Sequence, residues 1–321
     1  MKERVLVTGG SGFIGSHIVD KLVDKYDITV IDNLSFGTHD NLKQSSKEMG
    51  FIEADYVKEL SKYPKRVKSY DIIIHCAAQV STFSSVTEPE ETFRNNVEGT
   101  FRLYEAIRTY NPNCRIILTS SRSVYGDIDK DSKADEYTPY KVSTNYNLSK
   151  IYDELLAKTY NKLYGINTTI IRPSNVYGPR MPDKGLYGFL GRWISFVLQN
   201  KSIPIWGSGN QVRDWVFVED VAESYLRCIR NPDASSNQTY LLASGKGYTL
   251  IELANIIFNS CLTYDDKIEL NIQHFPPKVG DIQYFVGNSD KIQKQLGVKF
   301  RLLEEGISLT TKWVKENLDR Y

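Results

Sequence analysis

Three glycines, set between a short apolar run and an amphipathic stretch, constrain the fold of this chain more than any other sequence feature. They are Gly9, Gly12 and Gly15. The apolar run before them covers residues 4–8, apolar residues at helical spacing follow at 14–23, and a second apolar run covers 28–31. A strand, a glycine turn, a helix and a second strand within about 30 residues predict a βαβ unit, which implies a parallel sheet.

The alternation of strand and helix patterns continues to about residue 172. Strand patterns cover residues 71–75, 115–119 and 168–172, and helical patterns cover 90–110 and 143–164. This regularity predicts an α/β fold, in which a Rossmann-type doubly wound parallel sheet carries helices on both faces.

After Arg180 the alternation of strand and helix patterns becomes less regular, and glycine and proline become frequent. Helices are expected at 188–199, 218–230 and 250–261, with short strands between them. We expect residues 1–178 to form the Rossmann domain, with a returning segment near 213–232. Residues 179–321 should form mainly a smaller C-terminal α/β substrate domain, which would close over the crevice at the carboxyl ends of the strands.

The composition gives no electrostatic reason to expect nucleic acid or an anionic membrane as a partner. Lys plus Arg number 40 and Asp plus Glu 39, for a net charge of +1 over 321 residues. The four cysteines are widely spaced and form no metal-ligand pattern, so we expect free thiols, no metal and a cytoplasmic location. Neither a signal peptide nor a membrane-spanning segment is expected.

Each glycine of the first turn has a separate task if the turn binds a dinucleotide. Gly9 permits the tight turn, Gly12 lets the backbone approach a pyrophosphate, and Gly15 lets the helix pack closely on the sheet. The helix N-terminus would offer free N–H donors to the phosphates. Asp32 ends the next strand, where a carboxylate accepts both ribose hydroxyls and repels a 2′-phosphate, so NAD is favoured over NADP.

Tyr146 and Lys150 are four residues apart on an expected helix and therefore share a face. A free phenol is a weak base at neutral pH, but a nearby ammonium and the positive nicotinamide ring both favour the phenolate. A serine-rich segment upstream, residues 119–126, closes a parallel strand, so its hydroxyls should emerge near the nicotinamide. A serine there can hydrogen-bond a substrate hydroxyl and the phenolate, whereas Tyr125 is better explained as a packed core aromatic.

Taken in order, these segments and several others resemble the extended short-chain dehydrogenase/reductases, and in particular the UDP-glucose (galactose) 4-epimerases. The segments are TGGSGFIG from Thr8, DNLSFG from Asp32, HCAAQV from His75, NNVEGT from Asn95, SSRSVYG from Ser120, the Tyr146/Lys150 pair, RPSNVYGPR from Arg172 and GSGNQVRDWVFVEDV from Gly207.

The resemblance implies roles for individual residues. On the cofactor side it implies contacts to NAD from Gly9, Gly12, Phe13, Ile14, Gly15, Asp32, Asn33, Ser35, Gly37, Asp55, Tyr56, Cys76, Ala77, Ala78, Gln79, Ser120, Tyr146, Lys150 and Pro173, with Asn95 supporting the loop at 76–79. The catalytic residues would be Ser121, Tyr146 and Lys150. On the substrate side it implies Ser121, Tyr146, Asn175, Arg213, Lys278, Asp281 and Phe285.

The mechanism implied by the resemblance is oxidation at C4 of a UDP-hexose followed by unselective reduction. Tyr146 would take the proton of the 4-hydroxyl, the transient 4-keto sugar would turn about its bond to the diphosphate, and hydride would return to the other face. Tight NAD binding is then required. A homodimer through the helices near 90–110 and 144–164 is also implied.

Three departures from the family pattern bear on the substrate. Dehydratases of the family carry Asp-Glu where this chain has Arg122 and Ser123, which argues against a 4,6-dehydratase. The terminal R-x-G-D clamp reads K-V-G-D from Lys278, which loses a bidentate fork for the diphosphate. Phe285 falls where relatives vary residue size at the sugar C2 position, and its bulk favours plain glucose/galactose over the N-acetylated sugars.

Other functions stay open from the sequence alone. UDP-GlcNAc/UDP-GalNAc, CDP-, GDP- or dTDP-sugars, and a nucleotide-sugar reductase remain within the same class, although Asp32 opposes the NADP that a reductase usually needs. A non-catalytic NAD-binding regulator is disfavoured because Ser121, Tyr146 and Lys150 are all present.

Overall fold

The structure is a computed structural model that describes residues 2–182, 188–277 and 281–321. Its largest element is a seven-stranded, wholly parallel sheet in the order β10-β6-β5-β4-β1-β2-β3. The strands are β1 (Arg4–Thr8), β2 (Asp27–Asp32), β3 (Met49–Glu53), β4 (Ile72–His75), β5 (Arg115–Thr119), β6 (Thr168–Pro173) and β10 (Thr239–Leu242). The order of the first six is that of the Rossmann fold, which confirms the predicted fold class.

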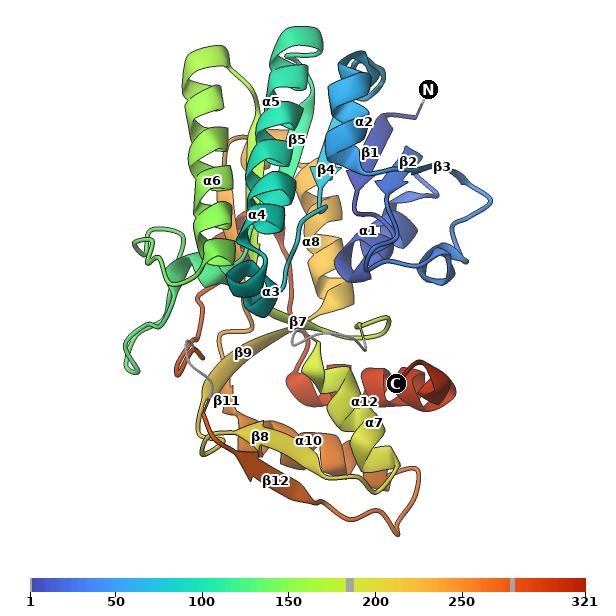
Figure 1. Ribbon diagram of the computed structural model, residues 1–321, viewed down its shortest axis with the longest axis vertical. Coiled ribbons are helices and arrows are strands. Elements are labelled where there is room, and N and C mark those ends of the chain that lie inside the picture. The colour runs from blue at the N-terminus through green and yellow to red at the C-terminus, as the bar shows by residue number, and fades with distance from the viewer. Residues whose placement is uncertain (1, 183–187, 278–280) are drawn as a thin grey trace.

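Alternate residues of β1, β2, β4, β5 and β6 supply two separate cores, one on each face of the sheet. Val5 and Val7 of β1 face α1 (Phe13–Leu22), α8 (Val218–Arg230) and α11 (Asp290–Leu296). Leu6 faces the opposite layer, formed by α2 (Tyr56–Lys62), α5 (Gly99–Tyr110) and α6 (Asn145–Tyr164). Figure 1 shows α5 and α6 standing side by side on this face. Burial on both faces of the sheet explains the continuous apolar run in the middle strands β1, β4 and β5.

A smaller α/β region lies at the carboxyl ends of these strands (Figure 1). Its third core packs α7 (Phe189–Leu198), α10 (Leu250–Leu262) and α12 (Leu303–Glu316) against two short sheets. One sheet has the order β11-β9-β7 (Gly247–Thr249, Val212–Phe217, Asn175–Tyr177), and the other pairs β12 (Ile272–Phe275) with β8 (Ile203–Trp206).

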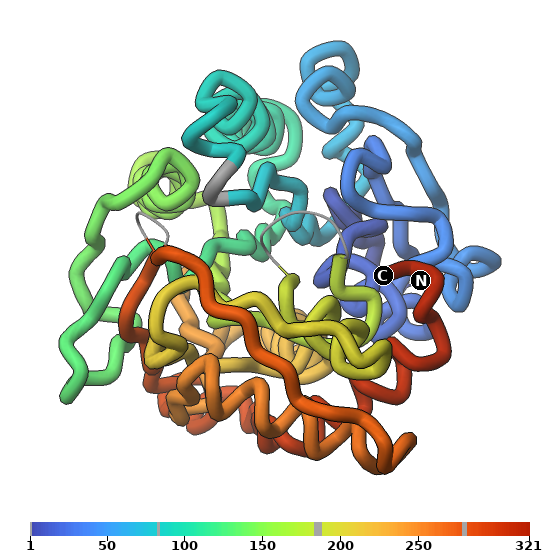
Figure 2. Tube along the Cα trace, turned by 60° about the horizontal axis from the view of Figure 1, so that its bottom comes forward, coloured from blue at the N-terminus to red at the C-terminus, as the bar shows by residue number. Residues whose placement is uncertain are grey.

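The part of the chain that returns to the large sheet is longer than residues 213–232. Beyond α8, the return includes strand β10 at the sheet edge and helix α11, whose Ile292 and Leu296 join the core beside α1. The C-terminus also comes back to the first half of the chain (Figure 2). There, Arg320 Nη2 donates to Asn41 Oδ1 at 3.2 Å. The two regions are therefore interleaved in sequence.

One predicted helix is interrupted. Residues 90–110 form α4 (Pro89–Thr92), a π-helical turn at Phe93–Glu98 and α5, rather than one regular helix. π-Helical turns inside α-helices are frequent at functional sites. Within the described residues, no helix combines the length and apolar character needed to span a bilayer. The remaining short elements are α3 (Thr82–Thr87), α9 (Pro232–Ser235) and 3₁₀ turns at His39–Leu42, Pro64–Ser69, Arg122–Tyr125 and Leu318–Arg320.

Candidate active site

A cavity of about 420 Å³ opens at the carboxyl ends of β1, β2, β4, β5 and β6. Each of the cofactor-side and catalytic residues predicted from the sequence lines it, as does Asn175 of the substrate side. The cofactor-side and catalytic residues are Gly9, Gly12, Phe13, Ile14, Gly15, Asp32, Asn33, Ser35, Gly37, Asp55, Tyr56, Cys76, Ala77, Ala78, Gln79, Asn95, Ser120, Ser121, Tyr146, Lys150 and Pro173. Residues from eight separate segments of the chain therefore meet in one cavity.

The glycine turn forms a tight cradle between β1 and α1. Gly9 has a φ of +69°, which L side chains rarely adopt, and a Cβ on it would lie 2.7 Å from the Ala77 nitrogen. A Cβ on Gly15 would lie 2.2 Å from the Gly9 carbonyl oxygen, so the close approach of α1 requires glycine. Gly12 caps α1 without a side-chain hydrogen bond, which leaves the first N–H groups of the helix facing the cavity.

Asp32 lies at the end of β2, beside the glycine turn. Its carboxylate accepts hydrogen bonds from the backbone N–H groups of Ser11 (2.9 Å) and Leu34 (2.8 Å). Burial raises the pKa of Asp32, and these two N–H groups oppose that rise. The carboxylate thus fixes the turns after β1 and β2 and still lines the cavity.

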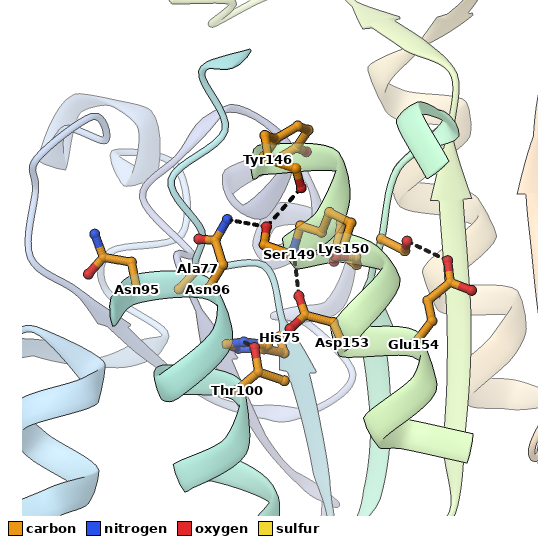
Figure 3. Close-up of polar contacts among 12 residues, drawn as sticks. His75, Ala77, Asn95, Asn96, Thr100, Tyr146, Ser149, Lys150, Asp153 and Glu154 are labelled. Carbon is orange, nitrogen blue, oxygen red and sulfur yellow. Dashed lines mark hydrogen bonds and ion pairs between the residues drawn. The ribbon is translucent and has the colours of Figure 1, made fainter. Parts of the chain in front are cut away.

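The loop after β4 is tied to its surroundings by Asn96, and not by Asn95 as predicted. Asn96 Oδ1 accepts from the Gln79 N–H at 2.8 Å, and Asn96 Nδ2 donates to the Gln79 carbonyl (3.0 Å) and to Ser149 Oγ (2.9 Å). Asn95 instead lines the cavity wall. The π-helical turn carries both asparagines, and it presents Asn96 to α6 as Figure 3 shows.

Tyr146 and Lys150 occupy successive turns of α6 and both line the cavity. Thr144 Oγ1 caps the helix by accepting from the Asn147 N–H at 3.1 Å, and the Asn147 side chain donates to the Ser123 carbonyl. This second bond joins the start of α6 to the turn that carries Ser121. The helix and the serine turn are thereby held together on the same wall.

Lys150 is buried and faces a buried acid (Figure 3). Its Nζ donates to the Thr119 carbonyl at 3.1 Å and to Asp153 Oδ2 at 3.2 Å. Burial lowers the pKa of Lys150, but the attraction of Asp153 and of Tyr146 outweighs it, so the pKa lies above its ordinary value. Lys150 therefore remains an ammonium in spite of its burial.

Further polar groups lie behind this pair. His75 Nε2 is 3.2 Å from Thr100 Oγ1, and His75 Nδ1 is 2.7 Å from Thr8 Oγ1. Burial, reinforced by the Lys150 cation, lowers the pKa of His75 to about 3, so the ring is neutral. The positive charge on this side of the cavity is consequently carried by Lys150 and not by His75.

Not all of the predicted substrate residues line the cavity. Arg213 Nη2 bonds Asp281 Oδ1 at 2.7 Å, and neither residue is part of the lining. Phe285 is fully buried, with its ring stacked on Tyr125, and it also stays outside the lining. Lys278 lies outside the described residues. Tyr125 is a packed core aromatic as predicted, and its hydroxyl accepts from Arg172 Nη1 at 2.7 Å.

Sequence reasoning missed three functional candidates: Asn96, Arg122 and Asp153. Arg122 lines the cavity next to Ser121. A signal for Asp153 was available, because a residue three after Lys150 shares its helix face. The cysteines are free as expected, although Cys76 lines the cavity and only the other three are buried.

Comparisons with known proteins agree with this geometry. The family model described as "NAD dependent epimerase/dehydratase family" matches residues 5–243. The UDP-glucose 4-epimerase of Mycolicibacterium smegmatis is 31% identical over 317 residues, which are 97% of this chain and 98% of that protein. A dTDP-glucose 4,6-dehydratase of the same species is 29% identical, with 98% and 94% covered.

Solved structures give the same picture. The Thermotoga maritima UDP-glucose 4-epimerase with UDP-glucose has a TM-score of 0.89 at 30% identity, with 98% of this chain and 99% of that chain covered. The UDP-N-acetylglucosamine 4-epimerase of Methanobrevibacter ruminantium also has a TM-score of 0.89, at 29% identity, with 99% and 100% covered. The protein belongs to the NAD-dependent epimerase/dehydratase family.

Proposed function

We propose that this protein is an NAD-dependent isomerase that inverts C4 of a UDP-linked hexose. The observation that carries the proposal is that Tyr146, Lys150 and Ser121 line the same cavity as the glycine cradle and Asp32. In the sheet, β5 with its serines is separated from β2 with Asp32 by β4 and β1. A dinucleotide laid across these strand ends would extend from Asp32 toward Tyr146.

The residues of the cradle fit NAD. The uncapped start of α1 offers N–H donors to a pyrophosphate, and added Cβ atoms at Gly9 and Gly15 would meet backbone within 2.8 Å. The carboxylate of Asp32 suits ribose hydroxyls and repels a 2′-phosphate. Bound NAD would supply the hydride acceptor and donor for the sugar carbon.

The side chains of this protein would handle the proton. The Tyr146 phenolate takes the proton of the sugar 4-hydroxyl and returns it at the end of the reaction, so one base serves both half-reactions. The Lys150 ammonium stabilises the phenolate, and the Ser121 hydroxyl hydrogen-bonds the same sugar oxygen. Ser121 Oγ already accepts from the Ser123 N–H at 3.1 Å, which leaves its own proton free to point at a ligand.

A dehydratase, such as the mycobacterial relative, needs a base for the sugar C5 proton. Positions 122 and 123 hold arginine and serine, and neither is a carboxylate. This difference favours the epimerase over the dehydratase. The names of the similar epimerases support UDP as the nucleotide and support both the plain and the N-acetylated hexose as substrates to be tested.

We also propose a homodimer through α5 and α6. Leu148 and Leu155, two turns apart on α6, are each 49% exposed, and Phe101 on α5 is 43% exposed. Neighbouring helices that expose large apolar side chains on one side of the sheet suit a symmetric helix-to-helix contact.

The deciding experiment incubates the purified protein, without added NAD, with UDP-glucose and separately with UDP-GlcNAc, and follows the C4 epimers by NMR. Conversion of either substrate would support 4-epimerisation with retained NAD. If neither substrate turns over even after NAD is added, the UDP-hexose proposal fails, and CDP-, GDP- and dTDP-sugars are then tested.

A further inference from the structure

Arg122 stands on the cavity wall beside the residues proposed to act on the sugar. It begins the 3₁₀ turn Arg122–Tyr125, directly after Ser121 at the end of β5. Arg122, Ser121 and Tyr146 all line the cavity. A guanidinium in this position is close to wherever the reacting part of a substrate binds.

Neutral partners hold the Arg122 guanidinium in place. Its Nη2 donates to Asn175 Oδ1 at 3.3 Å, and its Cζ lies 5.1 Å from the centre of the Phe285 ring. Phe285 is itself fixed, because it is fully buried and stacks on Tyr125 with a centroid distance of 5.9 Å. The cation therefore rests on a rigid aromatic surface and has little freedom to turn toward solvent.

The guanidinium lacks the counter-ion that other inward-facing arginines have. Arg172 pairs with Glu154 at 2.5 Å, and Arg213 pairs with Asp281 at 2.7 Å. In the described part of the chain, no carboxylate comes within ion-pair distance of Arg122, and its buried Nη1 has no hydrogen-bond partner. Burial, followed by repulsion from Arg213, lowers the pKa of Arg122 to about 9, and attraction by the carboxylates of Asp127 and Asp281, which lie beyond ion-pair distance, opposes this only in part.

A partly buried cation without an ion-pair partner is unfavourable unless a nearby group supplies more negative charge. A protein that keeps such a group in a ligand cavity can obtain that charge from the ligand. The ligand would then need an anionic group close to the atoms handled by Ser121 and Tyr146.

We infer that Arg122 binds a carboxylate carried by the sugar, so that the favoured substrate is a nucleotide-linked hexuronic acid. This inference rests on the proposed 4-epimerisation and narrows its substrate. In a hexuronic acid the C6 carboxylate is attached to C5, next to the reacting C4. Because Arg122 directly follows Ser121, its guanidinium is close to where this C6 carboxylate would lie. The planar guanidinium can bind both oxygens of a carboxylate at once. The carboxylate is bound and is not changed by the reaction.

The diphosphate is the other anionic group that could reach Arg122, and the experiment separates the two. Calorimetric titrations of the NAD-saturated protein would use UDP-glucuronic acid, UDP-glucose and UDP. The variants are Arg122→Gln and Arg122→Lys, with Arg227→Gln as a control, because Arg227 is a surface residue that pairs with Glu223. Thermal unfolding would check that each variant is folded.

We expect the unaltered protein and Arg227→Gln to bind UDP-glucuronic acid about 10- to 100-fold more tightly than UDP-glucose. Arg122→Gln should abolish this preference and leave the affinity for UDP within about 2-fold. Arg122→Lys should keep part of the preference, since the charge remains and the fork is lost.

Two results would overturn the inference. One is equal binding of UDP-glucuronic acid and UDP-glucose by the unaltered protein. The other is that Arg122→Gln weakens UDP and both sugar nucleotides equally, which would assign Arg122 to the diphosphate. Following C4 epimers in the same samples distinguishes the two proposals. Preferential binding without turnover would contradict 4-epimerisation alone, and turnover without preference would contradict the role of Arg122 alone.

Discussion

Lys150 and Asp153 form an ion pair of 3.2 Å that is shut away from solvent on one face of α6. Burial raises the pKa of Asp153 to about 6, although Lys150 opposes that rise. The carboxylate is thus ionised above about pH 6, and it keeps the Lys150 pKa above its ordinary value. Asp153 is a positioning residue, since it acts on the chemistry only through Lys150.

Asp153→Asn should therefore move the alkaline limb of the pH–rate profile to lower pH. Without the carboxylate, burial dominates and the Lys150 pKa falls, so the ammonium is lost at a lower pH than in the unaltered protein. The measurement is kcat between pH 6 and 10, with Asp220→Asn as a control for a buried acid outside the cavity. An alkaline limb that coincides with that of the unaltered protein would contradict this role.

Tyr146→Phe should lower kcat by about 10²- to 10⁴-fold, the usual contribution of a positioned acid–base group. Binding of NAD should change little, because only one hydroxyl is removed. Tyr152→Phe, on the same helix but outside the cavity lining, serves as the matched control and should keep full activity. Equal losses in both variants would mean that the effect comes from the helix and not from the phenol.

Substitutions of Gly12 and Gly15, at the start of α1, should have separate effects on stability and on NAD binding. Gly15→Ala places a Cβ 2.2 Å from the Gly9 carbonyl oxygen, and we expect a loss of about 1–3 kcal/mol in the free energy of unfolding. At Gly12 the nearest atom is 3.2 Å away, so Gly12→Ala should remain folded while NAD binding weakens. Urea unfolding and NAD titration of both variants test this. Unchanged NAD affinity in Gly12→Ala would argue against a pyrophosphate at this turn.

Asp32→Asn should weaken NAD binding by about 10- to 100-fold, because it removes charged hydrogen bonds to the ribose. Affinity for NADP should fall less, since repulsion of the 2′-phosphate is relieved at the same time. Titration with both nucleotides gives the ratio of the affinities for NAD and NADP. A ratio that does not shift toward NADP would show that Asp32 only supports the backbone of Ser11 and Leu34.

Charged residues on the exposed side of α6 should yield a monomer. Leu148→Glu combined with Leu155→Glu places carboxylates on the proposed interface, where they would be buried without partners. Sedimentation of the variant and the unaltered protein would measure the change in mass. Leu163→Glu, nearer the end of the same helix, offers a graded comparison, and a single species of unchanged mass in all three proteins would refute the interface.

The parts of the site that sequence predicted well are those fixed by local backbone chemistry. Gly9 needs a positive φ, Gly15 needs space, and Asp32 follows a buried strand, and each of these requirements is visible within a few residues of the chain. The strands β1 and β5 have the predicted bounds for the same reason, because the three central residues of each are all apolar. Strand β3 was not predicted, because Gly50 interrupts its apolar residues and Glu53 ends it, and β10 was expected only as one of the short strands between the later helices.

The parts that sequence did not predict depend on residues far apart in the chain. The choice between Asn95 and Asn96 was decided by the π-helical turn, which orients Asn96 toward Gln79 and Ser149. Phe285 packs on Tyr125 and carries Arg122 on its ring, an arrangement between positions more than a hundred residues apart. A motif comparison shows which position such a residue occupies, but not which residues it contacts.

Because the two regions are interleaved in sequence, the chain cannot be divided near residue 178 into two independent parts. A fragment that ends near residue 178 would lack β10, α8 and α11, and would expose the inner side of α1 and one edge of the large sheet. We therefore expect that neither half of the sequence folds alone or can be exchanged between relatives as a unit. Chimaeras designed to transplant sugar specificity should respect spatial neighbours, and should carry the turn at 122–125, β7 and residues 281–287 together.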